Sequence, residues 1–588
     1  MKKTLAILLS ALMVLSLSAV AVYADGPAPV ATAADFAAMT ADGNYQLTAD
    51  IEISASYAGA FTGTFDGNGH KITTTAPLFE DLGGTVKNLT INGTIAGATD
   101  ANVAAVAAMS TAGCTVENVI NNANVTADAA SLGGYEAGVY GSGFVAYVKA
   151  ASTFTNCVNN GSVTSTTTHV SGFVGFADNV DLTFTGCTNN GEVKNETVKT
   201  RTGGFVGVDG KNNSGKTFTI TLTNCKNTAN ITGGDQVGGL VGWTMYNVIV
   251  TGCENTGNVV STLNYAAGLV SRPGDDKCKT LAGCAASVFT NCKNSGNVTS
   301  AAGQASGIAS YICTPVEFYN CKNSGNITCV VDSTSGWAAG IAGKAAVGAG
   351  EHWIICENCE NTGNITGGDG AAGIAGNVGV KDNNTTGKTY VFTNCKNSGK
   401  ISGTKNRAAG IVGYIYGQDG KNQYGVLTGC VNTGDLYSST GYVSQFIAYT
   451  NSALTKIKDC IGAGTYNKIA ETDTPYMVIL GCSSANGGTV DGNKVPPEYD
   501  FSGNILIENS GVEYMSYATG DNSFNQVTLD AWITAHPGSF VIKTAAEIDA
   551  ILNPPTTNPT TGDATVWFAI AGAVALLGTA VVLKARKA

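Results

Sequence analysis

The chain of 588 residues contains few charged side chains and few histidines. Charged residues make up 13% of the sequence, and there are only 4 His. Lys and Arg number 32 against 43 Asp and Glu, which gives a formal net charge of −11. Because an acidic surface repels phosphate backbones, nucleic acid is not expected as a partner.

Motifs for catalysis and metal binding are also missing. The sequence has no Gly-x-Ser-x-Gly and no His-Glu-x-x-His, and His70, His169, His352 and His536 are scattered. Enzymes that cleave polysaccharides on a solenoid need carboxylates clustered on one face, and the acids here do not fall at matching repeat positions. The sequence therefore predicts no catalytic residue, no metal site and no cofactor. If the protein is nevertheless an enzyme, we expect a polysaccharide lyase or a glycoside hydrolase.

Long apolar runs are absent except at the two ends of the chain. Lys2 and Lys3 precede an apolar run from Leu5 to Val22, and this predicts a signal peptide over residues 1–24, with a retained anchor as the alternative. At the other end, apolar residues 564–583 precede a basic stretch at 584–588. About twenty apolar residues suffice for one membrane-spanning helix, and the basic tail places its end in the cytoplasm.

A short motif lies just before this last apolar run, within a Thr/Pro-rich spacer at 553–563. Its residues are Asn558, Pro559, Thr560, Thr561 and Gly562. The arrangement resembles the cell-wall sorting signal of Gram-positive surface proteins, in which a sortase cuts Leu-Pro-x-Thr-Gly between Thr and Gly and joins the Thr to peptidoglycan. Asn558 takes the place of the Leu. The resemblance implies sortase and peptidoglycan as partners and a body on the extracellular cell surface; a plain single-pass membrane anchor is the alternative.

Between these ends, one phrase recurs, nearly always as Cys-x-Asn-x-Gly-x-Val/Ile. Repetition at a period of tens of residues indicates a stacked solenoid. The spacing is uneven, with 30, 38 and 28 residues separating the first four copies, which favours a β-helix with loops of variable length over stacked helices. The repeated cysteines are Cys157, Cys187, Cys225, Cys253, Cys292, Cys321, Cys359, Cys395 and Cys430.

Each repeat contains an alternating strand, an Asn/Gly corner and a strand of small residues. Phe218–Thr223 shows the alternation, and Gly203–Gly207 shows the small residues. Leu222 and Cys225 are three residues apart, so both face inward only if the chain bends at Asn224. The Asn two residues after each Cys is expected at the corner, where Asn tolerates positive φ and its amide forms a ladder. These residues are Asn159, Asn189, Asn227, Asn255, Asn294, Asn323, Asn361, Asn397 and Asn432.

Blocks such as Gly238-Gly239-Leu240-Val241-Gly242 resemble the GLUG repeat of bacterial surface proteins, and Phe61–Ile72 resembles the first rung of their secreted β-helices. The resemblance implies an all-β, right-handed parallel β-helix (a solenoid) of about a dozen coils with small terminal caps. We expect an N-terminal cap at 25–60, repeats at 61–465 and a C-terminal cap or appendage at 466–552. Short helices are expected at Thr32–Met39, Thr528–Ala535 and Thr544–Leu552.

The 17 cysteines are an odd number, which argues against complete pairing. Stacked strands lie about 4.8 Å apart, whereas bridged Cβ atoms lie about 3.8 Å apart. We therefore expect a buried ladder of free thiols, and Leu89 and Val119 at the equivalent position indicate a site for a small apolar side chain. Cys278 and Cys284 in an inserted loop are a candidate disulfide.

Aromatic residues in the variable segments are candidates for binding sugar rings. Trp337 and Trp353 are the predicted binding residues, although either could instead close over the core. The sequence thus predicts a monomeric, surface-anchored solenoid that acts as an adhesin or ligand-display module for a glycan or a host protein. The alternatives are the enzyme named above and a structural stalk without a ligand.

Overall fold

A computed structural model describes residues 26–554 of the chain, apart from short gaps. The gaps are 98–100, 129–138, 167–168, 196, 198, 211–216, 276–277, 279–283, 331–335, 346–352, 380–387, 416–422, 451–453, 474–475, 483–488, 491–492, 495–497, 509–513 and 519–523. The chain divides into two compact units, Met1–Val541 and Ile542–Ala588. Each is described by itself.

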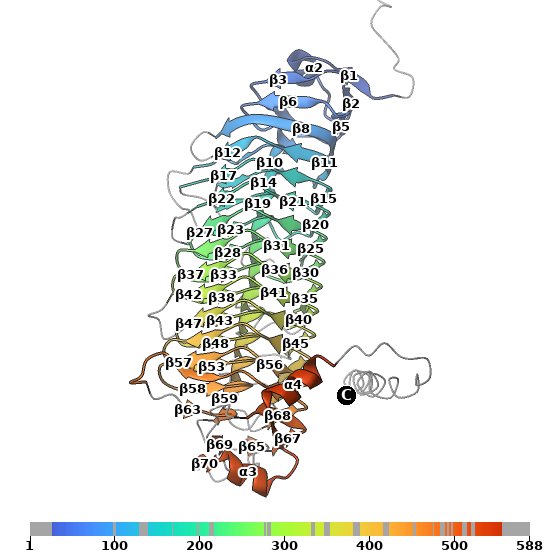
Figure 1. The fold of residues 1–588 in the computed structure, drawn as a ribbon. Helices are drawn as coiled ribbons and strands as arrows, with labels where there is room; N and C mark the ends of the chain where they lie inside the picture. The colour runs from blue at the N-terminus through green and yellow to red at the C-terminus, as the bar shows by residue number, and fades with distance from the viewer. Residues whose placement is uncertain are drawn as a thin grey trace, which may run out of the picture. The chain divides into compact units, whose positions relative to one another are not determined.

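The first unit is a parallel β-helix, as the sequence predicts (Figure 1). From Ser152 to Cys482 each coil contributes five short strands, and each strand pairs in parallel with its equivalent in the next coil. In β25 (Thr219–Thr223) and β30 (Asn247–Thr251), for example, Leu222 lies opposite Val250. Within the described residues the fifth strands and their N-terminal equivalents form a sheet of 14 strands.

The first strand of each coil alternates between the core and the surface. Phe154 and Phe184, on successive coils, stack in the core with ring centroids 4.9 Å apart. Thr153 and Thr155, on either side of Phe154 in the same strand, point outward. The first strands are β15 Ser152–Thr155, β20 Leu182–Thr185, β25, β30, β35 Ser287–Thr290, β40 Val316–Tyr319, β45 Trp353–Glu357, β50 Lys388–Thr393, β55 Gln423–Thr428 and β60 Leu454–Lys458.

The chain bends between the first and second strands, at the residue before the repeated Cys. Asn224 has φ 52° and Gly186 has φ 64° there, as the spacing of Leu222 and Cys225 predicts. The second strands are β16 Val158–Asn159, β21 Thr188–Asn189, β26 Lys226–Asn227, β31 Glu254–Asn255, β36 Lys293–Asn294, β41 Lys322–Asn323, β46 Glu360–Asn361, β51 Lys396–Asn397, β56 Val431–Asn432 and β61 Ile461–Gly462.

The third strands begin with a buried aliphatic or aromatic residue two positions after the Gly of the repeated phrase, which is Ala229 in one copy. Val163 and Ile231, for example, are both fully buried. These strands are β17 Val163–Thr164, β22 Val193–Lys194, β27 Ile231–Gly233, β32 Val259–Ser261, β37 Val298–Ser300, β42 Ile327–Cys329, β47 Ile365–Gly367, β52 Ile401–Gly403, β57 Leu436–Ser438 and β62 Tyr466–Lys468.

The fourth and fifth strands flank the small-residue block. The fourth strands are β9 Val103–Ala104, β13 Tyr140–Ser142, β18 His169–Ser171, β23 Arg201–Gly203, β28 Gln236–Gly238, β33 Tyr265–Ala267, β38 Gln304–Ser306, β43 Trp337–Ala339, β48 Gly370–Ala372, β53 Arg407–Ala409, β58 Tyr442–Ser444 and β63 Tyr476–Met477. The fifth strands are β4 Tyr57–Phe61, β7 Phe79–Leu82, β10 Ala107–Ser110, β14 Val145–Val148, β19 Val174–Ala177, β24 Val206–Asp209, β29 Val241–Thr244, β34 Val270–Pro273, β39 Ala309–Ile312, β44 Ala342–Ala345, β49 Ala375–Val378, β54 Val412–Ile415, β59 Ile447–Thr450 and β64 Leu480–Cys482.

The N-terminal coils are less regular and are covered by a short helix. Helix α2 (Ala33–Ala37) has Thr32 as its N-cap in a capping box with Asp35, and its Phe36 packs on Phe65 and Phe79 in the core. This helix is shorter than the expected Thr32–Met39. The strands here are β1 Ala28–Val30, β2 Asn44–Leu47, β3 Ile51–Ile53, β5 Thr64–Asp66, β6 Lys71–Thr74, β8 Thr85–Ala96, β11 Thr115–Asn121 and β12 Asn124–Thr126.

The parallel ladder extends past the expected limits of 61–465 at both ends. Strand β2 already pairs with β5, and β62 pairs with β57. The repeated phrase is lost in these coils, but their buried residues keep the same alternation, so pattern matching to the phrase ends too early. The C-terminal elements of this unit are β65 Thr489–Val490, β66 Asn493–Lys494, β67 Glu498–Ser502, β68 Asn504–Ile507, β69 Tyr514–Ala518, β70 Phe524–Thr528 and α3 Leu529–Ala535, with β71 Phe540–Lys543 at its border.

The second unit contains one described helix, α4 (Ala545–Leu552), which begins at the N-cap Thr544. Among the described residues, no helix is long and apolar enough to cross a membrane. The expected signal peptide at 1–24, the motif Asn558–Gly562 and the apolar segment 564–583 all lie outside the described residues.

Candidate functional site

The repeated cysteines form a column of buried thiols inside the β-helix. None of the nine is more than 1% exposed, and all nine are free. Each thiol for which a bond is described donates to backbone carbonyls: Cys292 Sγ lies 3.3 Å from Val250 O of the preceding coil and 3.4 Å from Thr290 O. Burial raises the pKa of the thiols of Cys321 and Cys395. These groups contribute to packing and are unreactive while the coil is closed.

The repeated asparagines form a second buried column beside the thiols. Asn255 Nδ2 donates to Asn294 Oδ1 at 2.8 Å and to Gly257 O, also at 2.8 Å. The same pair of bonds recurs from Asn121 to Asn397, and Asn432 ends the column on Gln445 Oε1. The expected positive φ is wrong for these residues: Asn227 lies in strand β26, and the left-handed residue is Asn224. Both columns hold the coils in register and face away from solvent.

The structure does not bring Trp337 and Trp353 together. Trp337 begins β43 and is 2% exposed, because its ring lies over Gly370 and Gly413, where a Cβ would collide with it. Its burial contradicts the interpretation of this residue as an exposed platform for sugar. Trp353 begins β45 in another sheet, is half-buried, and donates from Nε1 to Glu317 Oε1 at 2.8 Å.

The small-residue block instead builds a re-entrant bend between the fourth and fifth strands. A Cβ on Gly203 or Gly238 would collide with the carbonyl oxygen of Val206 or Val241, so in these two coils the strands approach more closely than any larger residue allows. Other coils place Ala or Ser at this position, as in β33 and β38. The bend leaves the first residue of the fourth strand and the third residue of the fifth strand facing each other on the outer side.

We call these two columns of residues the outer crease. They lie outside the main core. In the same strands, the main core is formed by the second residue of the fourth strand and the first residue of the fifth, such as Val237 and Val241. The fourth-strand column is Tyr140, His169, Arg201, Gln236, Tyr265, Gln304, Trp337, Gly370, Arg407 and Tyr442; the fifth-strand column is Tyr147, Phe176, Val208, Trp243, Arg272, Tyr311, Lys344, Asn377, Tyr414 and Tyr449.

The N-terminal part of the crease is closed by a second apolar cluster. Tyr140 and Phe176 stack with centroids 4.6 Å apart, and Val208, Trp243 and Met245 are buried with them. His169 is 1% exposed beneath Tyr140 and accepts a hydrogen bond from Arg201 N at 3.1 Å. Burial, together with the positive charge of Arg201, lowers the pKa of His169 to about 3. This part therefore contributes to stability.

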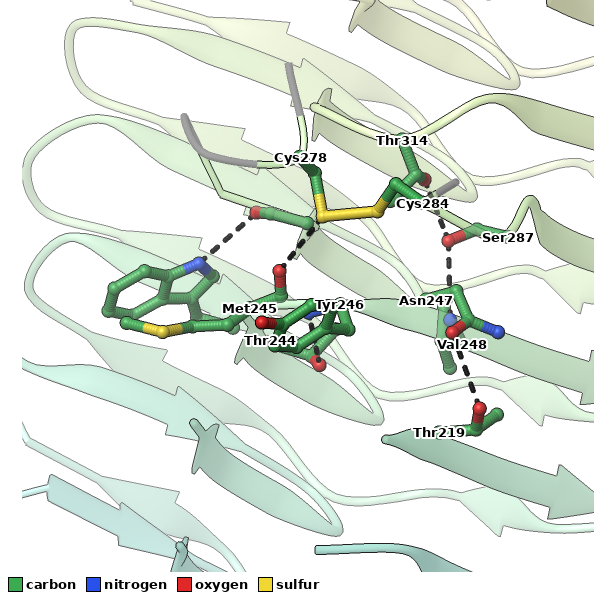
Figure 2. Close-up of a disulfide and its surroundings, with 12 residues drawn as sticks. Thr219, Thr244, Met245, Tyr246, Asn247, Val248, Cys278, Cys284, Ser287 and Thr314 are labelled. Atoms are coloured by element: carbon green, nitrogen blue, oxygen red, sulfur yellow. Dashed lines mark hydrogen bonds between the residues drawn. A yellow bond between two sulfur atoms is a disulfide. The ribbon is translucent and has the colours of Figure 1, made fainter. Parts of the chain in front are cut away.

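A disulfide lies beside this closed part (Figure 2). It joins Cys278 and Cys284, whose Cα atoms are 5.6 Å apart, as the sequence suggests. Cys278 Sγ lies 3.2 Å from Met245 O. Trp243 Nε1 donates to Gly274 O at 3.2 Å, and Thr314 Oγ1 donates to Ser287 Oγ at 2.8 Å. The bridge thus lies next to Met245, which directly follows the strand that carries Trp243.

The C-terminal part of the crease carries two patches of half-buried aromatic and cationic side chains. The first patch consists of Tyr265, Arg272, Tyr311 and Lys344. The second patch consists of Arg407, Tyr414, Tyr442 and Tyr449. All eight side chains are half-buried.

Aromatic stacking and cation–π contacts order both patches. In the first, Tyr265 and Tyr311 stack with centroids 4.8 Å apart, and Arg272 and Lys344 lie 5.3 and 5.9 Å from the Tyr311 centroid. Burial raises the pKa of Tyr265 to about 12, so its hydroxyl stays protonated. In the second, the Arg407 guanidinium lies 5.0 Å from the Tyr414 centroid and 4.6 Å from that of Tyr449.

Outside the crease, three other kinds of site could carry a function in the described residues: a metal site, a cavity or a buried ionisable group. No group of three or more His, Cys, Asp or Glu residues there is suited to hold a metal ion. A cavity of about 390 Å³ is lined by Thr126, Asp128 and Lys194 among others, and none of its lining residues is aromatic. Asp209 is fully buried at a core position between Ala177 and Thr244, and burial raises the pKa of its carboxyl group.

Comparison with known proteins does not assign this chain to a family. No protein-family model and no curated protein matches the sequence. Among solved structures, the chain is similar to that of a provisionally named immunoglobulin A1 protease from Bacteroides ovatus, at 14% identity over 73% of this chain and 84% of that chain, with a TM-score of 0.18. A TM-score this low does not establish a shared fold, so no activity is taken from that protein.

Proposed function

We propose that this protein is a cell-surface β-solenoid that binds a glycan through its outer crease. In this proposal residues 1–24 direct export, and the body is held outside the cell, either joined to peptidoglycan through Thr561 by a sortase or retained by the segment 564–583. The helix is right-handed, capped at both ends and monomeric. The columns of Cys and Asn stiffen it, and the crease presents the recognition groups.

The observation that carries this proposal is the pair of half-buried aromatic patches on one outer face. Tyrosine rings held by stacking, such as Tyr265 on Tyr311, have little conformational freedom left to lose when a ligand binds. Such rings offer an apolar face next to polar groups, and this suits a sugar ring, which has an apolar face and a rim of hydroxyls. The patches recur along the stacking direction, so one extended chain can contact both.

The test is a glycan-array screen of the exported chain, with reducing-end release measured on the same polysaccharides. We expect saturable binding without release. Tyr311→Ala together with Tyr449→Ala should abolish binding, whereas Trp353→Phe, on another sheet, should not affect it. Release of reducing ends would support an enzyme instead. Neither binding nor release would support a structural stalk or a protein partner.

Location is tested separately from binding. We expect the chain to be released from intact cells by peptidoglycan hydrolase, and Thr561→Ala to shift it to the membrane fraction. Recovery of the unaltered chain only in the membrane fraction would favour the plain single-pass anchor.

A further inference from the structure

Two cations flank a single aromatic ring in the first patch. Arg272, Tyr311 and Lys344 are the third residues of β34, β39 and β44, three successive strands of one sheet. Tyr311 lies directly opposite Lys344 in the register. Because Arg272 and Lys344 both approach the Tyr311 ring, the two positive charges lie on either side of one ring along the stacking direction.

The spacing of these groups follows from the β-helix itself. Successive parallel strands are about 4.8 Å apart, so the two cations are separated by about 9.6 Å along the stack. The rise of one coil is comparable with the length of one sugar residue in an extended polysaccharide. A chain that runs along the crease would therefore present one sugar to each coil, with alternate sugars meeting a cation.

The charges of the patch contrast with those of the chain as a whole. The formal net charge is −11, yet this part of the crease places a guanidinium and an ammonium group among tyrosines. A half-buried cation next to an aromatic face interacts more strongly with an anion than a fully solvated one does. The second patch differs, because its one cation, Arg407, lies over Tyr414 and Tyr449 and is paired with Asp369 at 3.3 Å.

We propose that Tyr265, Arg272, Tyr311 and Lys344 bind a linear glycan that carries an acidic group on every second sugar. The uncharged sugar lies against the stacked pair Tyr265 and Tyr311, and the acidic groups of the sugars on either side pair with Arg272 and Lys344. This inference rests on the proposed function, since it assumes that the crease binds a glycan, and it adds the charge and the repeat of that glycan.

The experiment compares binding of the exported chain to four probes. Hyaluronan alternates a uronate with a neutral sugar, carboxyl-reduced hyaluronan lacks the charge, polygalacturonate carries an acid on every sugar, and heparin carries sulfate as well as carboxylate groups. We expect hyaluronan to bind more tightly than its carboxyl-reduced form by about tenfold or more, because each lost charge pair weakens the complex. Heparin distinguishes a requirement for carboxylate from a requirement for any anion.

A matched pair of double variants assigns the binding to the patch. Arg272→Gln with Lys344→Gln should reduce hyaluronan affinity about tenfold or more and leave the carboxyl-reduced probe unaffected. Lys293→Gln with Lys396→Gln removes the same charge from two exposed lysines of the second strands and should change neither affinity. The comparison of probes on the unaltered chain keeps the test valid if the first double variant does not fold.

The outcomes separate this inference from the proposed function. Equal binding of hyaluronan and its carboxyl-reduced form, lost in Tyr311→Ala, would overturn the acidic glycan and leave a glycan-binding crease. Tighter binding of polygalacturonate than of hyaluronan would overturn the alternating repeat. Absence of binding to any probe and to the wider array would overturn both proposals.

Discussion

Asn294 and Asn323, on successive coils, are joined by a buried hydrogen bond in which Nδ2 of the first donates to Oδ1 of the second at 2.8 Å. The same Nδ2 donates to Gly296 O at 2.9 Å, and Asn294 Oδ1 accepts from Asn255 Nδ2. Each amide therefore links its own turn to both neighbouring coils. Because a buried polar group costs free energy when unpaired, the column fixes the register of the whole stack.

Asn294→Ala should destabilise the β-helix by on the order of 2 kcal/mol or more, since it leaves Asn323 Oδ1 and one N–H of Asn255 without their partner. Chemical denaturation followed by circular dichroism measures the loss. The matched control is Asn297→Ala, which removes an exposed amide that accepts from Asn326 N and should have a smaller effect. Equal effects of the two variants would show that burial of the column is unimportant.

Cys292→Val should fold and bind as the unaltered chain does, whereas Cys292→Ala should be less stable because it leaves a cavity. The equivalent position holds Leu89 and Val119 in earlier coils, so the site accepts a branched aliphatic side chain. Thermal midpoints measure stability, and the array measures binding. Loss of binding in a well-folded Cys292→Val variant would assign the thiol a role beyond packing.

The interior of the coils could be predicted from the sequence because it obeys a strict local pattern. The phrase around Cys225 and Asn227 repeats in the same letters, and the three-residue step from Leu222 to Cys225 requires a bend. Only the residue with positive φ was misplaced, from Asn224 to Asn227. Burial and turn chemistry leave few alternatives at such positions.

The crease was missed because its residues share a position and not a type. Arg201, Gln236 and Tyr265 all stand two residues before the small residue that ends the fourth strand, and nothing in their chemistry marks them as equivalent. Alignment on the Gly-Gly block would have placed them in one column. For Trp337 the sequence leaves open a binding residue or one that closes over the core, and burial confirms the second, because three glycines far along the sequence, Gly370, Gly376 and Gly413, make room for its side chain.

His169→Gln should remove a pH-dependent loss of stability. Burial lowers the pKa of His169 to about 3, below its ordinary 6.5. The stabilisation from the neutral ring is therefore present above pH 6.5 and declines as pH falls, because the unfolded chain takes up the proton first. Between pH 7.5 and pH 5 the unaltered chain should lose about 2 kcal/mol from this group. Denaturation at the two pH values measures it; an unchanged slope in His169→Gln would assign the pH dependence to other groups.

The Asp209 carboxyl should make stability depend on pH in the opposite direction to His169, and Asp209→Asn should remove that dependence. Burial raises the pKa of the Asp209 carboxyl, so the folded chain prefers its protonated form. The unaltered chain is then most stable below the pKa of the unfolded carboxyl, near 3.9, and loses stability as pH rises towards the folded pKa, by about 1.4 kcal/mol per pH unit. Asp209→Asn should therefore melt at a higher temperature than the unaltered chain at pH 7 and at a similar temperature near pH 3.5. A lower melting temperature at pH 7 would show that the carboxylate is paired in solution.

Trp337→Ala should act on stability and not on glycan contacts. The ring is buried over Gly370 and Gly413 and stacks on Tyr414 with centroids 6.2 Å apart, so its removal opens a cavity that the surrounding backbone cannot fill. Loss of a buried Trp costs about 3–5 kcal/mol. The double variant Trp337→Ala with Gly370→Leu places an aliphatic side chain in the vacated space and should recover part of that loss. Thermal midpoints of the three chains test this order. If Trp337→Ala instead keeps the melting temperature and abolishes glycan binding, the ring is a recognition residue, and the crease opens around it in solution.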